Sequence, residues 1–290
     1  MDTENIWTLT GSAVPYNYTS IGTKCSDDEI VGYFSTTRAL FGEIANRFDD
    51  ELHTEWAVRN YLALKMVLAA TLLAASAEYA EEHNLGIAAP YLNYYTLINA
   101  ARAFLFTLPC TTWKGTTSLG MTHRNIINTA SDKLRRLSQN LSDKAKPLLR
   151  QAQMQRELFS YRFPASGFSI IGKPPVATSE AIDWAQIFAE LAQANSACLE
   201  GASLKRNLGP FELLDSSNTW LAMTYDDDLA LVDMEDWYRI GYIARKQKTP
   251  TTLVELATEG LLDDFFGSWC SETRGGFDPD SQKNLLLDFY

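Results

Sequence analysis

The chain of 290 residues has a hydrophobic content of 46%, a charged content of 21% and an aromatic content of 12%. This composition excludes a disordered chain, and the length is enough to bury one large hydrophobic core or two smaller ones. The net charge of −11 argues against general binding of nucleic acid, because that affinity follows the neutralisation of phosphate by basic residues.

The first 25 residues are rich in Thr, Tyr, Gly and Ser, which predicts an irregular N-terminal arm. The opening sequence MDTENIWTLT has neither the basic nor the apolar stretch of a signal peptide. The longest apolar run, residues 62–77, is interrupted by Lys65 and is too short for a membrane span. We therefore expect a cytoplasmic protein that does not bind a membrane.

Helix signals follow one another along most of the chain. Ser26, as an N-cap with Glu29 three residues later, is a strong start signal. The predicted helices cover residues 26–48, 50–83, 91–108, 122–140, 142–161, 178–204, 234–246 and 250–269. Short strands are conceivable only at 168–171 and 220–225, so the sequence predicts an all-α fold.

A break with Pro164, Gly167, Pro174 and Pro175 predicts a domain boundary. It separates a helical bundle at 26–165 from a helical, acidic C-terminal region at 176–290. The C-terminal residues 285–290 are apolar enough to dock on the rest of the protein.

Metal and cofactor motifs are missing from the sequence. The chain has four cysteines: Cys25, Cys110, Cys198 and Cys270. They are far apart, so we expect reduced and mostly buried thiols rather than a zinc site. The acidic run Asp226–Asp228 lacks the pattern of a calcium loop, and no phosphate-binding or dinucleotide-binding glycine motif occurs. We expect no metal and no cofactor.

Basic residues are concentrated in one stretch. Residues 132–162 contain eight basic and three acidic residues, a net charge of +5 that leaves −16 for the rest of the chain. The candidate nucleic-acid contacts are His123, Arg124, Lys133, Arg135 and Arg136, because a helix N-terminus and guanidinium groups both favour phosphate. The alternative is a solvated helix face that pairs with the acidic C-terminal third, and charge runs of this kind are usually solvated faces.

A second candidate site lies on the predicted helix 91–108. Tyr94, Tyr95 and Arg102 could share one face, because Arg102 follows Tyr95 by seven residues. If that face is buried, Arg102 needs an acidic or carbonyl partner, which favours a structural ion pair. The alternative is a small-molecule pocket inside the bundle.

These two segments together resemble the HEPN superfamily of prokaryotic immunity and toxin systems. The matching residues are Tyr94, Tyr95, Ala100, Ala101, Arg102, Ala103, Leu105, Thr122, His123, Arg124, Ile126 and Ile127. The arrangement is also similar to the uncharacterised YaaC-like proteins. The resemblance covers roughly residues 26–160 and implies a HEPN-like helical bundle.

HEPN ribonucleases use an arginine with a histidine five to seven positions later, and only Arg47 and His53 have that spacing here. The resemblance implies that Arg47 stabilises phosphate and that His53 does acid–base chemistry on the 2′-hydroxyl. The chain departs from the family pattern, because Phe48 replaces a polar residue and three acids, residues 49–51, separate the pair. The pair also precedes the helix with the two tyrosines, whereas the family motif lies late in the domain.

The leading hypothesis is a prokaryotic defence or toxin-system component that contacts RNA or a nucleic-acid-bound partner, with a metal-independent ribonuclease as its catalytic form. The alternative is a scaffold subunit whose acidic C-terminal third, with 16 acidic and 6 basic residues from residue 212 on, binds a partner protein or a second copy. Trp237, Tyr238 and Trp269 would then anchor the interface. The sequence leaves open whether the protein is an enzyme.

Overall fold

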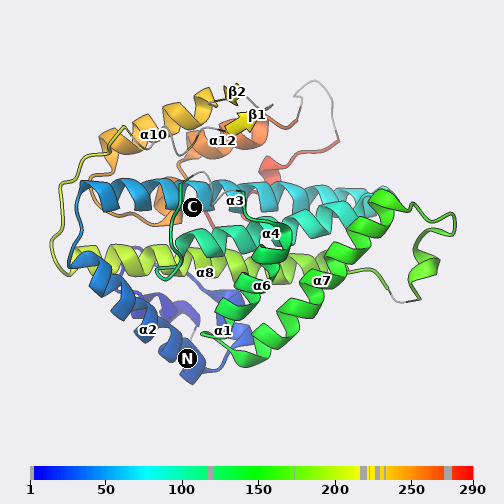
Figure 1. The fold of residues 1–290 in the computed structure, drawn as a ribbon, viewed down its shortest axis with the longest axis horizontal. Helices are drawn as coiled ribbons and strands as arrows, with labels where there is room; N and C mark the ends of the chain where they lie inside the picture. The colour runs from blue at the N-terminus through cyan, green and yellow to red at the C-terminus, as the bar shows by residue number, and fades with distance from the viewer. Residues whose placement is uncertain are drawn as a thin grey trace. The chain divides into compact units, whose positions relative to one another are not determined.

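The computed structural model describes residues 3–115, 120–172, 174–215, 221, 223–225, 229–231, 233–270 and 276–289. Over these residues the protein is all-α, as predicted, and its elements are shown in Figure 1. The α-helices are α1 (Thr19–Lys24), α2 (Asp27–Ala45), α3 (Asp50–Glu82), α4 (Ala89–Thr107), α6 (His123–Leu134), α7 (Gln139–Tyr161), α8 (Thr178–Leu204), α10 (Met234–Lys246), α11 (Leu253–Leu256) and α12 (Glu259–Gly267). The 3-10 helices are η1 (Thr3–Leu9), η2 (Gly167–Ile171) and η3 (Asp280–Gln282).

Extended structure in the described residues is limited to two strands of three residues. Strand β1 (Met223–Tyr225) pairs in antiparallel fashion with β2 (Leu229–Leu231), and Met223 lies opposite Leu231. Strand β1 lies within the segment 220–225, where the sequence allowed a short strand. The ladder is too short to change the all-α character of the fold.

The chain forms two compact units, each built from three separate stretches. Unit 1 comprises Met1–Leu64, Leu105–Thr122 and Leu191–Ala257, and unit 2 comprises Lys65–Phe104, His123–Glu190 and Thr258–Tyr290. Neither unit coincides with the ranges 26–165 or 176–290 expected from the sequence. The long helices α3, α4 and α8 each contribute one part to each unit.

The N-terminal segment of unit 1 is ordered, and the prediction of an irregular arm is wrong. Residues 3–9 and 19–24 form η1 and α1. The side chains of Ile6, Tyr18 and Ile21 are fully buried, which anchors the segment by hydrophobic burial. Helix α2 starts as predicted, with the Ser26–Glu29 capping box in place.

In unit 2, helices α6 and α7 pack against each other (Figure 1). The sequence predicted a helix to residue 140, but α6 ends at Leu134. The chain turns, and Ser138 starts α7 by accepting a hydrogen bond from the backbone N–H of Leu141. The buried face of α7 repeats every three or four residues, with Leu141, Ala145, Leu148, Ala152 and Phe159.

Two other predicted elements differ from the structure, and a third is confirmed. Residues 167–171 form the 3-10 helix η2, where the sequence suggested a strand or an extended link. The single helix expected over 250–269 is divided into α11 and α12, because Thr252 and Thr258 each cap a helix start. The C-terminal tail docks as predicted, with Leu286, Leu287 and Phe289 buried.

Helix α3 is long and apolar enough to cross a membrane by length and composition, and 67% of its most apolar window is buried within the protein. Burial of this kind is also what a core helix shows.

The four cysteines form no disulfide, but only Cys198 is buried, while Cys25, Cys110 and Cys270 are partly exposed. The expectation of mostly buried thiols is therefore wrong.

Candidate functional site

Five side chains of unit 2 come together from three helices. Tyr94, Tyr95 and Arg102 lie on α4, His123 is the first residue of α6, and Arg156 lies on α7. The ring of His123 is 5.5 Å from that of Tyr94 and 6.0 Å from that of Tyr95, measured between centroids. The guanidinium carbon of Arg156 lies 5.1 Å and 6.0 Å from the same two rings. We call these five residues the arginine–tyrosine cluster.

Several polar atoms of the cluster are buried without a hydrogen bond of standard geometry. The side chain of Tyr94 is 0% exposed, and its hydroxyl interacts with the guanidinium group of Arg156 but makes no hydrogen bond of standard length and angle to a described residue. The Nε atoms of Arg102 and Arg156 are also buried and unbonded within the described part of the chain. Such atoms cost free energy unless something bonds to them, so the cluster has free hydrogen-bonding capacity.

The two arginines differ in their acidic neighbours. Arg156 lies 3.9 Å from the carboxylate of Glu157. Arg102 forms no ion pair with a described residue, so the structural ion pair favoured by the sequence is not found there. The neighbours that act on its charge are Tyr94 and Tyr95, and burial lowers the pKa of Arg102. Arg102 is thus a partly buried cation without a carboxylate counter-ion among the described residues.

The cluster also changes the acid–base properties of its members. Burial raises the pKa of Tyr94 to about 12, although the positive charge of Arg156 opposes the shift. Burial lowers the pKa of His123, and the charges of Arg102 and Arg156 lower it further, while Glu157 acts in the opposite direction. The neutral form of the imidazole is therefore favoured relative to an ordinary histidine.

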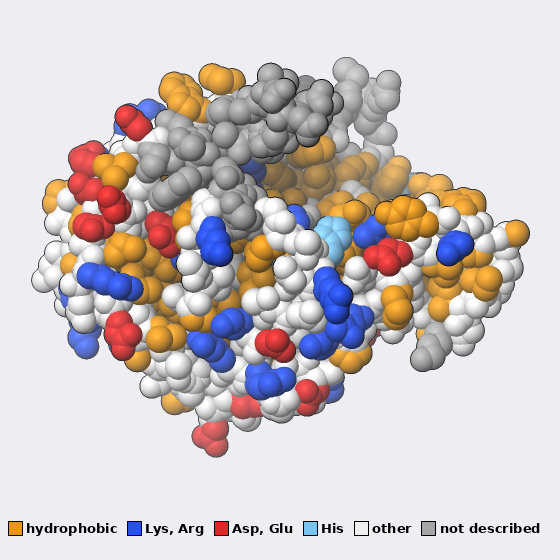
Figure 2. Space-filling view, viewed as in Figure 1, with side chains coloured by type: hydrophobic (Ala, Val, Ile, Leu, Met, Phe, Trp, Pro, Cys, Tyr) orange, Lys and Arg blue, Asp and Glu red, His pale blue; other side chains and the backbone are white. Residues whose placement is uncertain are grey.

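Basic side chains gather on the neighbouring surface of α6 and α7, as Figure 2 shows. Arg124, Arg135 and Arg136 are exposed there, and Lys133 is partly exposed. Lys146 approaches Asp132 at 4.0 Å, which is a weak exposed ion pair. We call the exposed and partly exposed basic residues of 124–162 the basic surface; they are Arg124, Lys133, Arg135, Arg136, Lys144, Lys146, Arg150, Arg156 and Arg162.

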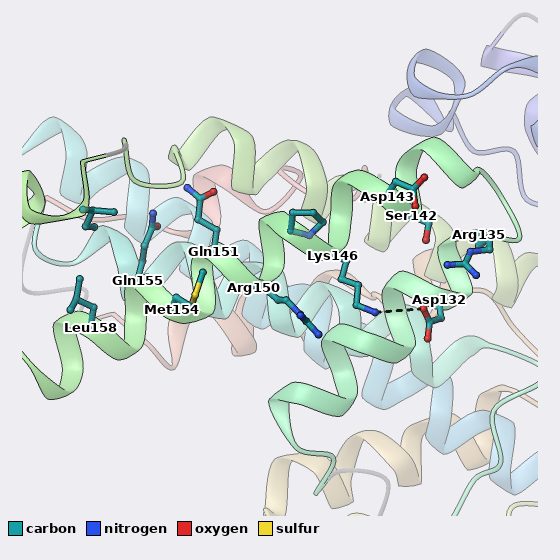
Figure 3. Close-up of a pocket in the computed structure, with 12 residues that line it drawn as sticks. Asp132, Arg135, Ser142, Asp143, Lys146, Arg150, Gln151, Met154, Gln155 and Leu158 are labelled. Atoms are coloured by element: carbon teal, nitrogen blue, oxygen red, sulfur yellow. Dashed lines mark ion pairs between the residues drawn. The ribbon is translucent and has the colours of Figure 1, made fainter.

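A groove of about 710 Å³ runs along α7 next to this surface. Figure 3 shows Asp143, Lys146, Arg150 and Met154 following one another along the helix, with Lys146 directed toward Asp132 of α6. The groove is charged at the α6 end and apolar at the other end. The complete lining is Asp132, Arg135, Ser142, Asp143, Lys146, Pro147, Arg150, Gln151, Met154, Gln155, Leu158 and Ile171.

Arg47 and His53, the pair implied by the resemblance, do not form an accessible site. Arg47 is exposed, whereas the side chain of His53 is 1% exposed inside unit 1. The Nε2 atom of His53 lies 3.3 Å from the carbonyl oxygen of Gln247, and its ring stacks on Phe211. Burial lowers the pKa of His53. In this structure the imidazole of His53 is therefore shielded from solvent, which counts against a role in RNA cleavage.

Acidic residues do not form a metal site in the described part of the chain, where no group of three or more metal-ligating side chains is found. The run Asp226–Asp228 lies outside the described residues. Nearby, Asp233 caps α10, and Asp236 accepts a hydrogen bond of 2.7 Å from the hydroxyl of Tyr61. These two carboxylates have structural roles.

Comparison with known proteins gives no further information. No family model, no curated protein and no solved structure matches this chain. The resemblance to HEPN domains therefore rests on the residues quoted above, and a function has to be argued from the site itself.

Proposed function

We propose that the protein binds single-stranded RNA on the basic surface of α6 and α7. The observation that carries this proposal is the segregation of charge, with eight basic and three acidic residues in residues 132–162 of an otherwise acidic chain. Most of these basic side chains are exposed, and Arg135 and Arg136 form no ion pair with a described residue. They are available to neutralise phosphate.

The arginine–tyrosine cluster supports a single strand as the nucleic acid, and the choice of RNA rests on the resemblance to HEPN ribonucleases. Single strands are bound by basic grooves combined with aromatic rings on which bases stack. Tyr95 is partly exposed next to Arg156, so a ring and a guanidinium group are available at one place. The acidic remainder of the chain repels phosphate, which confines binding to this surface and makes it sensitive to salt.

Catalysis is not part of this proposal. A metal-independent ribonuclease built on Arg47 and His53 stays a prediction of the resemblance, and the burial of His53 counts against it. The wider role in prokaryotic defence, or in a toxin system, rests on the same resemblance.

The test is the affinity for a fluorescently labelled RNA strand, measured by anisotropy at several salt concentrations. The double variant Arg135→Glu/Arg136→Glu should weaken binding at least tenfold, by an order-of-magnitude estimate, and reduce the slope of log K against log salt by about 1.4, at about 0.7 for each lost phosphate contact. The matched control is Arg245→Glu/Lys246→Glu, an exposed basic pair at the end of α10 in unit 1. It changes the net charge equally, so an equal effect of both variants would contradict a local RNA site.

A second candidate function, a protein-interaction subunit, is favoured by the exposed aromatic residues. Trp237 and Tyr238 on α10 are 52% and 50% exposed, and Trp269 is 66% exposed. Exposed tryptophan and tyrosine side chains are frequent anchors of interfaces. Sedimentation velocity at about 0.1 M and 1 M salt separates the two candidates, because screening weakens RNA binding but not apolar association. Self-association that persists at high salt and is lost in Trp237→Ser would support the interaction role.

A further inference from the structure

The arginine–tyrosine cluster has the properties of an anion site rather than of a packed core. Arg102 is partly buried without a carboxylate among the described residues, and Arg156 shares the cluster with it. A cation removed from water needs a counter-ion or several acceptors. Glu157 supplies one negative charge near Arg156, so the two arginines retain a net charge of +1 within the cluster.

The unsatisfied atoms of the cluster are all hydrogen-bond donors. The Tyr94 hydroxyl is fully buried and makes no hydrogen bond of standard geometry to a described residue, and the Nε–H groups of Arg102 and Arg156 are also unbonded within the described residues. Guanidinium groups match the geometry of phosphate oxygens, and a neutral hydroxyl can donate to a third oxygen. His123 is the first residue of α6, and the free backbone N–H groups in the first turn of a helix favour an anion.

We infer that the arginine–tyrosine cluster binds the phosphate monoester of a nucleotide. This site would be part of the proposed RNA-binding surface. The choice of phosphate over carboxylate as the bound anion rests on the proposed RNA binding. Two sources share this chemistry, namely the 5′-phosphate end of an RNA strand and a free nucleoside monophosphate. Arg102, Arg156 and Tyr94 hold the phosphate, and the partly exposed ring of Tyr95 lies where the attached base can stack.

The experiment compares two RNA strands of the same sequence, one with a 5′-phosphate and one with a 5′-hydroxyl, in anisotropy titrations. The wild-type protein should bind the 5′-phosphate strand about tenfold more tightly, because only that strand offers a terminal phosphate for charge-assisted hydrogen bonds from the cluster. The preference should disappear in Tyr94→Phe and in Arg156→Gln. It should remain in Arg135→Glu/Arg136→Glu, in which binding of both strands is weakened.

The same titrations with adenosine monophosphate identify the source of the phosphate. If adenosine monophosphate displaces the 5′-phosphate strand at a concentration similar to that of the strand, the free nucleotide is favoured as the ligand. If it does not displace the strand, the 5′-phosphate end of RNA is favoured. Tyr94→Phe removes a hydroxyl that makes no hydrogen bond of standard geometry to a described residue, so its thermal unfolding should stay close to that of the wild type. Arg156→Gln provides the second, independent test if Tyr94→Phe folds poorly.

The two proposals fail separately. Equal affinity for both strands together with no binding of adenosine monophosphate would overturn the phosphate site and leave the basic surface standing. Binding of adenosine monophosphate that is lost in Tyr94→Phe, in a protein that binds neither strand, would support the phosphate site and overturn the proposed RNA binding.

Discussion

Arg59 donates a hydrogen bond of 2.7 Å from its Nε atom to the backbone carbonyl oxygen of Phe106. Its Nη2 atom donates to the carbonyl oxygen of Leu108 at 2.6 Å, and Nη1 pairs with Glu55 at 2.8 Å. The last carbonyl groups of a helix have no partner within the helix, and here a buried guanidinium group of α3 bonds them at the end of α4. The guanidinium carbon also lies 3.8 Å from the ring of Trp56. Arg59 therefore joins two helices within unit 1.

Replacing Arg59 by methionine should destabilise the protein by about 3–5 kcal/mol, because the carbonyl groups and Glu55 lose their charged partner in a buried place. Urea unfolding followed by tryptophan fluorescence measures the change. Lys248→Met is the control, since it removes a 2.8 Å ion pair with Glu212 that is largely exposed and should cost less than about 1 kcal/mol. Similar costs for the two variants would contradict the role given to Arg59.

Local signals explain what the sequence predicted correctly. Helix α10 has the predicted bounds, 234–246. The N-cap Asp233 is a local signal for its start, and the backbone becomes extended at Gln247. The capping box of Ser26 likewise fixed the start of α2. The prediction of one helix over 250–269 was wrong because the apolar periodicity continues through Thr258. In the structure the side chain of Thr258 accepts a hydrogen bond from the backbone N–H of Leu261, and this cap starts a separate helix.

The candidate site was predictable only in part, for a related reason. Tyr94, Tyr95 and Arg102 lie on one helix, so their spacing placed them together. His123 and Arg156 reach the same place from other helices, and no periodicity relates them to α4. Arg156 appeared in the sequence only as one member of a basic run, and its position beside Tyr94 depends on how α7 packs.

The pKa of His123 should lie below its usual value of 6.5, because burial and the charges of Arg102 and Arg156 disfavour the imidazolium form. Two neighbouring substitutions should move it in opposite directions. Arg156→Gln removes a positive charge and should raise the pKa, whereas Glu157→Gln removes a negative charge and should lower it further. The titration of the imidazole Cε1–H resonance by NMR measures both shifts, with His123→Gln to identify the signal. Shifts of the same sign would show that the cluster is not assembled as described.

Glu200 should make stability depend on pH. It is buried in unit 1 and accepts a hydrogen bond from the hydroxyl of Ser12, and burial raises the pKa of its carboxyl above the usual 4.5. The folded state then binds more protons than the unfolded state, so the free energy of unfolding falls as pH rises from 4.5 through the raised pKa. Glu200→Gln keeps a carbonyl acceptor for Ser12 and should lose this fall.

Urea unfolding at a series of pH values from 4 to 8 tests this prediction. Glu200→Gln should gain stability relative to the wild type as pH rises, because the variant has no carboxyl at this buried position to be deprotonated. Parallel curves for the wild type and Glu200→Gln would mean that the carboxyl of Glu200 is not perturbed in the folded state.

Gly201 on α8 should not tolerate a side chain. A Cβ atom there would lie 2.6 Å from the carbonyl carbon of Gly11 and 2.6 Å from the carbonyl oxygen of Thr10, so the backbone of the N-terminal segment would have to move. Gly201→Ala should therefore cost at least about 1–3 kcal/mol, the usual range for overpacking. Gly32→Ala on α2 is the matched control, because its Cβ would have no neighbour within 4 Å and alanine favours a helix by about 1 kcal/mol. Opposite shifts in the unfolding midpoint are expected, and a stabilised Gly201→Ala would show that residues 10–11 do not lie against α8 in solution.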